Sequence, residues 1–305
     1  EDVDIIIAAG NTTMLYLLIG RNPESLSHAP FEADCLFDEQ TELKGISTYL
    51  PPCMNAFVGA DITCALLESD QCEHDDEISL LCDIGTNGEI ALWHGGKLFV
   101  TSTAAGPAFE GAGLSMGMQG EEGAISHVQL ADEADLTDGV MKVDETSGFA
   151  VQIIGQTKAR GICGSGVIDA VRCLLESEVM DETGFLEDEE AVIADSVLMT
   201  QEDIRKVQLA KSAICAGMEA MLNKAELEME ELDELLIAGG FGSFLNLDSA
   251  RYIGLLPRRK PVKTTVCGNA ALKGAAELLL NADTVEESRQ IAASAQPLNL
   301  ATDPF

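Results

Sequence analysis

The sequence predicts a mixed α/β fold, and three observations carry this prediction. Residues 78–102 contain three apolar segments separated by tight turns, which is typical of a three-stranded meander. Thr200 is a candidate helix cap, and apolar residues follow it at helical spacing to about Leu222. The apolar strand at 235–238 leads to paired glycines, and an Ala-rich helix is expected at 269–280. Strands and helices that alternate along a chain predict an α/β protein.

Local signals of the same kind predict the remaining elements. Before the meander we expect a strand at 3–8, a helix at 14–19 capped by Thr12 or Thr13, a loop-rich region at 22–52 and an apolar helix that ends at Leu67. The acidic stretch 69–77 predicts a boundary between two lobes. After the meander we expect short strands near 126–130, 141–143 and 150–154, a helix at 164–175 and a loose tail at 294–305.

Composition argues against several classes of function. The 305 residues carry a net charge of -34, which repels nucleic-acid phosphates and anionic membrane surfaces. No apolar run has the length of a membrane span, and the first residues lack the pattern of a signal peptide. Nine cysteines without a C-x-x-C pair predict a reducing cytoplasm, no disulfides and no metal cluster. We therefore expect a soluble cytoplasmic protein without a nucleic-acid or membrane partner.

The strongest motif is the heptapeptide DIGTNGE that begins at Asp83 and turns one apolar strand back into another. Glycines let the backbone bend sharply, so the N–H groups of Gly85, Thr86, Asn87 and Gly88 suit the binding of phosphates. Asp83, at the strand end, is suited to organise a hydrated Mg²⁺ that bridges these phosphates. The alternative interpretation is an ordinary tight hairpin with an aspartate in its turn.

A second motif is Gly239-Gly240-Phe241-Gly242, which directly follows a buried strand. Paired glycines at a strand end let an adenosine lie flat against the backbone. The alternative interpretation is a plain turn between a strand and a helix.

Weaker signals single out further positions. Gly106 and Glu110 lie in a small-residue segment after the meander, where Glu110 either orients water or a metal ion or is simply solvated. The run Gly164-Ser165-Gly166 opens a helix and suits either an anion or close helix packing. Cys163 is expected in the core. Lys211 lies on the apolar stripe of its helix, from which it either extends to solvent or reaches a buried anion or ribose.

The order of these motifs resembles that of the actin/Hsp70/sugar-kinase (ASKHA) superfamily. More narrowly, the chain resembles the C-terminal ATPase domain of the reductive activators of corrinoid-dependent enzymes. The segments that carry this resemblance span nearly the whole chain and are residues 9–14 (AGNTTM), 57–62 (FVGADI), 83–90 (DIGTNGEI), 102–111, 161–166, 237–242 and 253–257 (IGLLP).

The resemblance implies an actin-like fold of two lobes built on RNase H-like sheets, with ATP and Mg²⁺ in the cleft. It implies that ATP turnover drives the reduction of Co(II) to Co(I) in a corrinoid protein of methyl transfer. The electron is then expected from a [2Fe-2S] cluster in an N-terminal domain. For such an ATPase we expect Asp83 to organise the metal, and we expect Asp83, Asp61 and Glu110 to take part in catalysis, Asp61 by analogy of position only.

The sequence departs from the family in two ways. It has no cysteine-cluster domain, and it lacks the opening Asp-x-Gly-Thr hairpin, which is the first phosphate motif. We therefore expect a fragment of a longer protein, or a degenerate relative, with an incomplete first lobe. On this interpretation, residues 1–75 are the remainder of the first ATPase lobe, residues 76–268 are the second lobe with an inserted subdomain at about 107–200, and residues 269–305 are a closing helix and tail.

Two other functions stay open at this point. One is a small-molecule (sugar or acyl) kinase of the same superfold, since a fold does not fix a function. The other is a non-catalytic interaction module with a vestigial cleft. For an activator, the expected partner is a corrinoid protein or corrinoid methyltransferase component, and a homodimer is expected by resemblance only.

Overall fold

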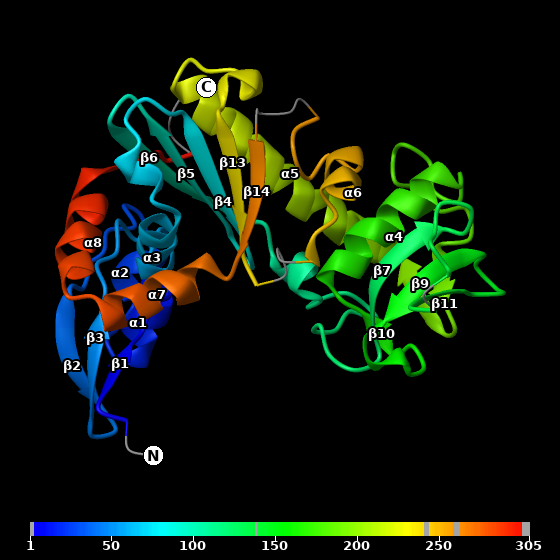
Figure 1. Ribbon diagram of the computed structural model, residues 1–305, viewed down its shortest axis with the longest axis horizontal. Helices are drawn as coiled ribbons and strands as arrows, with labels where there is room; N and C mark the ends of the chain where they lie inside the picture. Colours follow the sequence, from blue (N-terminus) through cyan, green and yellow to red (C-terminus); the bar gives the residue numbers. More distant parts are fainter. Residues whose placement is uncertain (1–2, 138, 241–243, 259–262, 301–305) are drawn as a thin grey trace.

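The computed structural model describes residues 3–137, 139–240, 244–258 and 263–300. Figure 1 shows a central sheet with an N-terminal unit, residues 3–73, on one side and an inserted unit, residues 107–200, on the other. Helices α7 (Ala270–Leu280) and α8 (Asp283–Ser294) come late in the chain but lie beside the N-terminal unit. No helix in these described ranges is long and apolar enough to cross a membrane.

The central sheet has six strands in the order β14-β13-β4-β5-β6-β15. Their bounds are β4 Ser79–Ile84, β5 Gly88–His94, β6 Lys97–Thr103, β13 Glu234–Ala238, β14 Lys263–Gly268 and β15 Ala295–Pro297. β4, β5 and β6 pair in antiparallel fashion, so the predicted meander is confirmed. β13 joins β4, β14 joins β13 and β15 joins β6, each in parallel.

Helices cover both faces of this sheet. α5 (Gln201–Lys224) packs against one face, where its apolar stripe shares a core with Leu80. α3 (Ala60–Ser69), α7 and α8 cover the other face, where they share a core with Leu81. Because side chains alternate between the two faces of a strand, Asp83 lies on the face that α3 covers.

α3 and α7 cross at very short distance. A Cβ atom added at Gly274 in α7 would lie 1.9 Å from the carbonyl oxygen of Cys64 in α3. Any side chain at this position would force the helices apart, so the glycine is what permits the crossing. The crossing fixes α3 over the sheet, and with it Asp61, which lies in the first turn of α3.

Besides α3, the N-terminal unit contains a three-stranded sheet of order β1-β3-β2 and two shorter helices. The elements are β1 Ile5–Ile7, α1 Thr12–Leu18, α2 Glu24–Ser27, β2 Glu39–Leu43 and β3 Ile46–Leu50. The prediction of a loop-rich region at 22–52 is wrong for its second half, because β2 and β3 form an antiparallel hairpin. Its turn, Lys44-Gly45, has φ angles of 52° and 82°.

The cap predicted for α1 is also wrong. The side chain of Asn11 accepts the hydrogen bond from the N–H of Met14, so the cap is Asn11 rather than Thr12 or Thr13. The hydroxyl of Thr12 instead donates to the carbonyl oxygen of Asn55 at 2.6 Å. This bond ties the start of α1 to the loop that precedes α3.

The inserted unit contains a four-stranded sheet of order β10-β7-β9-β8 and a separate hairpin, β11-β12. Its elements are β7 Ala124–Leu130, β8 Met141–Val143, β9 Phe149–Ile153, β10 Gly161–Ile162, α4 Gly164–Glu176, β11 Glu190–Ala194 and β12 Val197–Thr200. The three predicted strands and the predicted helix are confirmed. α5 follows directly, and the side chains of Thr200 and Asp203 form the capping box at its start.

The expectation of a loose tail at 294–305 is wrong for its first residues. Ala295–Pro297 forms β15, and the N–H of Leu298 donates to the carbonyl oxygen of Val100 at 2.8 Å. Residues 301–305 lie outside the described part of the chain. α6 (Leu247–Tyr252) and β14 complete the fold.

Candidate functional site

The turn between β4 and β5 is held by backbone hydrogen bonds. The N–H of Gly85 donates to the carbonyl oxygen of Asn87 at 2.9 Å, and the N–H of Gly106 donates to that of Thr86 at 2.8 Å. At Gly88, an added Cβ would lie 2.9 Å from a side-chain carbon of α5. The four residues predicted to bind phosphates therefore form one compact turn, which we call the phosphate turn, and Gly106 lies against it.

The paired glycines lie beside the phosphate turn. β13 runs parallel to β4, and Ala238 is the register partner of Asp83. Gly239 has a φ of 115°, and an added Cβ would lie 2.3 Å from the carbonyl oxygen of Ile84, so the position requires glycine. An added Cβ at Gly240 meets no described atom within 4 Å. Two segments that are far apart in the sequence thus meet at the C-terminal ends of β4 and β13.

Three carboxylates gather between the sheet and α3. Asp83 and Glu89 are register partners on adjacent strands, and Asp61 lies in the first turn of α3. Burial raises the pKa of Asp83 to about 7, and the charges of Asp61 and Glu110 contribute further. Burial, followed by the charges of Asp61 and Asp83, raises the pKa of Glu89 to about 8. Burial also raises the pKa of Asp61.

These shifts arise first because the carboxylates are removed from water, and for Asp83 and Glu89 also because like charges lie nearby. A cation among the carboxylates would relieve this repulsion. In the described ranges, no group of three or more His, Cys, Asp or Glu side chains is arranged to hold a metal ion directly. The arrangement instead fits a hydrated Mg²⁺ that contacts one or two carboxylates and fills its shell with water and phosphate oxygens.

Glu110 contacts the phosphate turn from the side of the inserted unit. It ends a short 3₁₀ helix, η2 (Pro107–Glu110). The hydroxyl of Thr86 donates to its Oε2 at 2.6 Å, and its Oε1 lies 3.4 Å from a Cβ added at Gly85. Glu110 and Gly240 both line a cavity of about 890 Å³ between the central sheet and the inserted unit. We call this cavity the inner cavity.

Three residues predicted to hold the nucleotide are not seen in this arrangement. Lys211 lines a different cavity, between α4, α5 and α6, where its Nζ lies 3.3 Å from a Cβ added at Gly254. Lys211 does not line the inner cavity, and its expected contact with the adenosine stays a prediction. Phe241 and Gly242 lie outside the described residues.

The glycines at the start of α4 are explained by packing. An added Cβ at Gly164 would lie 1.8 Å from the carbonyl oxygen of Phe109, and one at Gly166 would lie 2.3 Å from that of Ile125. Close helix packing, one of the two interpretations of this run, is therefore confirmed. Cys163 is buried, as expected.

Glu89 is a member of the carboxylate group to which sequence reasoning gave no role. Its side chain is 6% exposed. The spacing in the sequence indicates this position, because a tight turn at 85–87 places residues 83 and 89 opposite each other on the same face. A second carboxylate in that register was therefore predictable once the hairpin was accepted.

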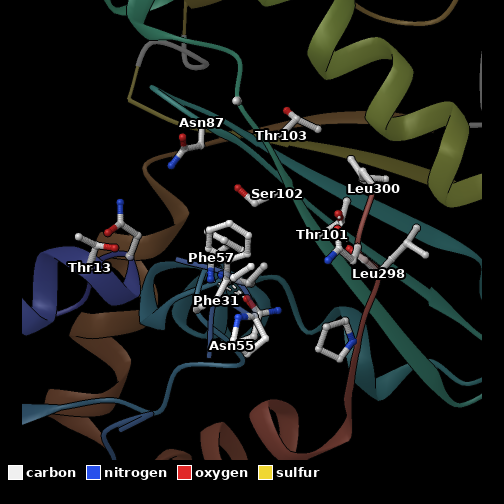
Figure 2. A pocket seen from close by; sticks show the side chains of 18 of the residues that line it. Thr13, Phe31, Asn55, Phe57, Asn87, Thr101, Ser102, Thr103, Leu298 and Leu300 are labelled. Carbon is white, nitrogen blue, oxygen red and sulfur yellow. Dashed lines mark hydrogen bonds between the residues drawn. The ribbon is translucent and has the colours of Figure 1, made fainter. Parts of the chain in front are cut away.

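A second cavity, of about 960 Å³, lies between the N-terminal unit and β6, and we call it the outer cavity. Figure 2 shows Phe31 and Phe57 close together within it, and their ring centroids are 5.6 Å apart. Asn87 and Ser102 border it on the side of the phosphate turn, and Leu298 borders it on the side of the tail. All the described side chains that line it are uncharged.

Comparison with known proteins gives consistent matches. A family model described as the C-terminal domain of RACo, the ASKHA domain, matches residues 77–305, and one described as the RACo middle region matches residues 1–73. The chain is 33% identical over 342 residues to the corrinoid activation enzyme RamQ of Eubacterium limosum, with 100% of this chain and 54% of that protein covered.

It is also 30% identical over 272 residues to the Co(II) methylated amine-specific corrinoid protein reductase of Methanosarcina barkeri, with 86% of this chain and 49% of that protein covered. Among solved structures, a reductive activator for corrinoid, iron-sulfur protein matches with a TM-score of 0.84 and 31% identity, over 98% of this chain and 50% of that one. The chain thus spans about half the length of the curated relatives it matches.

Proposed function

This chain belongs to the RACo family, and we propose that it is the ATP-binding and ATP-hydrolysing part of a protein that reductively activates a corrinoid protein. In this proposal, residues 1–75 are the remainder of the first ATPase lobe. Residues 76–268 are the second lobe with the inserted subdomain, and residues 269–305 are the closing helix and tail. The names of the relatives support the activity, because both are enzymes that act on corrinoid proteins.

One observation supports the nucleotide site above all. The phosphate turn lies beside Gly239 and Gly240, at the C-terminal ends of β4 and β13. The N–H groups of the turn are assigned to the phosphates, and the open backbone at Gly240 is assigned to the adenosine. Phosphoryl transfer needs positioning and charge neutralisation more than covalent chemistry from the protein. Backbone donors beside a group of carboxylates supply both.

The carboxylates divide the remaining roles. Asp83 would hold the hydrated Mg²⁺ that neutralises the phosphates. Asp61 is assigned to the water shell of that ion, because its charge acts on Asp83 across the gap between α3 and the sheet. Glu110 is held by the hydroxyl of Thr86 against the phosphate turn, where it is suited to orient the attacking water.

ATP turnover would be coupled to cobalt through the partner protein. Reduction of Co(II) to Co(I) adds one electron, and an external donor of the [2Fe-2S] type supplies it. ATP hydrolysis shifts this step only if the nucleotide state changes the relative affinity for the Co(II) and Co(I) forms of the partner. The activity therefore requires that partner docking depend on the occupant of the cleft.

Isothermal titration calorimetry tests the nucleotide site directly. We expect this chain to bind ATP in the presence of Mg²⁺, and we expect Asp83→Asn to abolish the dependence of binding on Mg²⁺. Asp76→Asn, at an exposed carboxylate before β4, is the matched control and should bind like the unchanged chain. Absence of ATP binding by the unchanged chain and by a longer form that includes a first phosphate motif would contradict the proposal.

The activation itself is read from the visible spectrum of the corrinoid. A form of the protein that carries or is supplied with the electron donor should convert an inactive Co(II) corrinoid protein to Co(I) only when ATP and Mg²⁺ are present. The Asp83→Asn variant of that form should leave the Co(II) spectrum unchanged. Equal conversion of Co(II) to Co(I) with and without ATP would show that ATP turnover by this chain does not drive the reduction.

One observation favours a second candidate function, a small-molecule kinase. The outer cavity is uncharged and reaches Asn87 in the phosphate turn, so it is placed where an acceptor hydroxyl would have to lie. ATP-dependent phosphorylation of an uncharged acceptor, without any Co(I) signal, would favour this candidate over the activator.

A further inference from the structure

A histidine and an aspartate in the inserted unit form a pair that the proposed roles do not use. His127 lies on β7 and Asp169 lies on α4. The Nδ1 of His127 lies 3.0 Å from Oδ2 of Asp169, and the N–H of Val128 donates to the same oxygen at 3.4 Å. The Asp169 side chain is 1% exposed, whereas that of His127 is 29% exposed.

Burial of Asp169 is costly unless the carboxylate is paired. Its Oδ1 has no hydrogen-bond partner within the described ranges, so His127 and the N–H of Val128 are the partners that the structure shows for this side chain. An ionised carboxylate only accepts hydrogen bonds, so the Nδ1 of His127 carries the proton. The pair therefore fixes both the orientation and the tautomer of the imidazole ring.

The His127 side chain also borders the inner cavity. His127 lines this cavity together with Glu110 and Gly240, which come from the two sides of the proposed nucleotide site. Its Nε2 has no hydrogen-bond partner in the part of the chain that the structure describes. The described lining includes one carboxylate, Glu110, and His127 is its one side chain that can carry a positive charge.

We propose that His127 binds a phosphate oxygen of the nucleotide through Nε2, and that Asp169 is the positioning residue that holds the ring for this contact. The inference rests on the proposed nucleotide site. A polyphosphate beside Glu110, in a chain with a net charge of -34, needs positive charge besides the metal ion. The protonated imidazole supplies it, because both ring nitrogens then donate, one to Asp169 and one to the ligand.

The rival explanation is that the pair only ties β7 to α4. Two replacements of His127 separate the explanations, because each keeps one end of the ring. His127→Asn keeps an amide that can reach Asp169 but removes the group at Nε2. His127→Gln reaches toward the position of Nε2 with a neutral donor. If the pair has only a structural role, the stability of each variant should depend on whether it keeps the contact with Asp169. If His127 binds the ligand, the ATP affinity of each variant should depend on whether it keeps a donor at the position of Nε2.

Calorimetry with ATP, ADP and adenosine, each with Mg²⁺, supplies the readout. We expect His127→Asn to unfold near the wild-type temperature and to bind ATP and ADP about ten- to a hundredfold more weakly, as for loss of a charged hydrogen bond. Adenosine should bind as before, and His127→Gln should recover part of the loss. His28→Ala, at an exposed histidine of the N-terminal unit, is the control.

Asp169 is tested by a double-mutant cycle. Asp169→Asn should weaken ATP binding, and adding it to His127→Asn should weaken binding no further, because both act through the same ring. Unchanged ATP affinity in His127→Asn, or equal losses of affinity for ATP and adenosine, would overturn the proposal that His127 binds a phosphate. The nucleotide site itself would stand in that case, because the wild type still binds ATP. A wild-type chain that binds none of the three ligands, alone or in the longer form, would instead remove the nucleotide site and this inference with it.

Discussion

Replacement of Asp83 by Asn tests whether the buried carboxylates lower the free energy of unfolding in the absence of a ligand. Asn has nearly the same shape but no charge. The pKa of Asp83 is raised from 3.8 to about 7, first by burial and then by the charges of Asp61 and Glu110. Between about pH 4 and pH 7, the folded protein therefore keeps the proton on Asp83, whereas the unfolded chain has released it. The free energy of unfolding falls as the pH rises through this window.

The magnitude follows from the shift. One pKa unit corresponds to about 1.4 kcal/mol, so ionised Asp83 costs at most about 4 kcal/mol above pH 7. We expect Asp83→Asn to be more stable than the wild type by about 2–4 kcal/mol at about pH 8. This corresponds to a Tm higher by roughly 4–8 °C. The difference should shrink as the pH falls toward 4 and vanish below about pH 3, because Asp83 is then protonated in both states.

Thermal unfolding without nucleotide or metal, followed from about pH 4.5 to about pH 8.5, measures this difference. Asp76→Asn, at an exposed position, should show no comparable pH-dependent gain. The reasoning fails if Asp83→Asn is no more stable than the wild type at pH 8, or if its gain is the same at every pH. A stabilised variant that has lost Mg²⁺-dependent ATP binding would identify Asp83 as a residue kept for function at a cost in stability.

Four other substitutions and one titration probe the same arrangement. Glu89→Gln should also raise the Tm, by an amount that grows as the pH rises from about 4.5 to about 8, because burial raises the pKa of Glu89 from 4.5 to about 8. Gly239→Ala should lower stability by about 2 kcal/mol or more and abolish ATP binding, whereas Gly240→Ala, at an open position, should fold normally. Gly274→Ala should destabilise by about 1–3 kcal/mol in thermal unfolding, because its Cβ would overlap the backbone of α3. Calorimetry at several pH values should show that the advantage of the wild type over Asp83→Asn in Mg²⁺–ATP affinity grows from about pH 6 to about pH 8, since a metal ligand must lose its proton; an advantage that shrinks over this range would argue against a carboxylate ligand at Asp83.

The elements that the sequence predicts correctly are those whose signals are local. The meander has apolar strands joined by short turns, and α5 has both a cap and a long apolar stripe, so neighbouring residues suffice to specify them. β15 (Ala295–Pro297) carries no strand pattern of its own, and its pairing with β6 depends on a segment far away in the sequence. The hairpin β2-β3 is hidden by the prolines on both sides of it, although Lys44-Gly45 is a suitable turn.

The same limit applies to the site. The phosphate turn and the paired glycines are visible as glycine patterns, because only glycine tolerates such backbone geometry or close approach. Lys211 interrupts an apolar stripe, but the stripe does not say which cavity the helix borders, so its contact with a nucleotide stays a prediction. The pairing of His127 with Asp169 joins two elements across a separation of 42 residues, and neither residue lies in a recognisable motif.

The strand order of the central sheet has a consequence for how the chain folds. β4, β5 and β6 pair with immediate neighbours in the sequence, so this hairpin ribbon can form early. Its edge at β4 remains open until β13 arrives, after the whole inserted unit and α5 have been made. Its other edge, at β6, is closed by β15, among the last described residues. Exposed strand edges pair readily with other chains, so molecules shortened just before Ala295 should aggregate during refolding more than the intact chain.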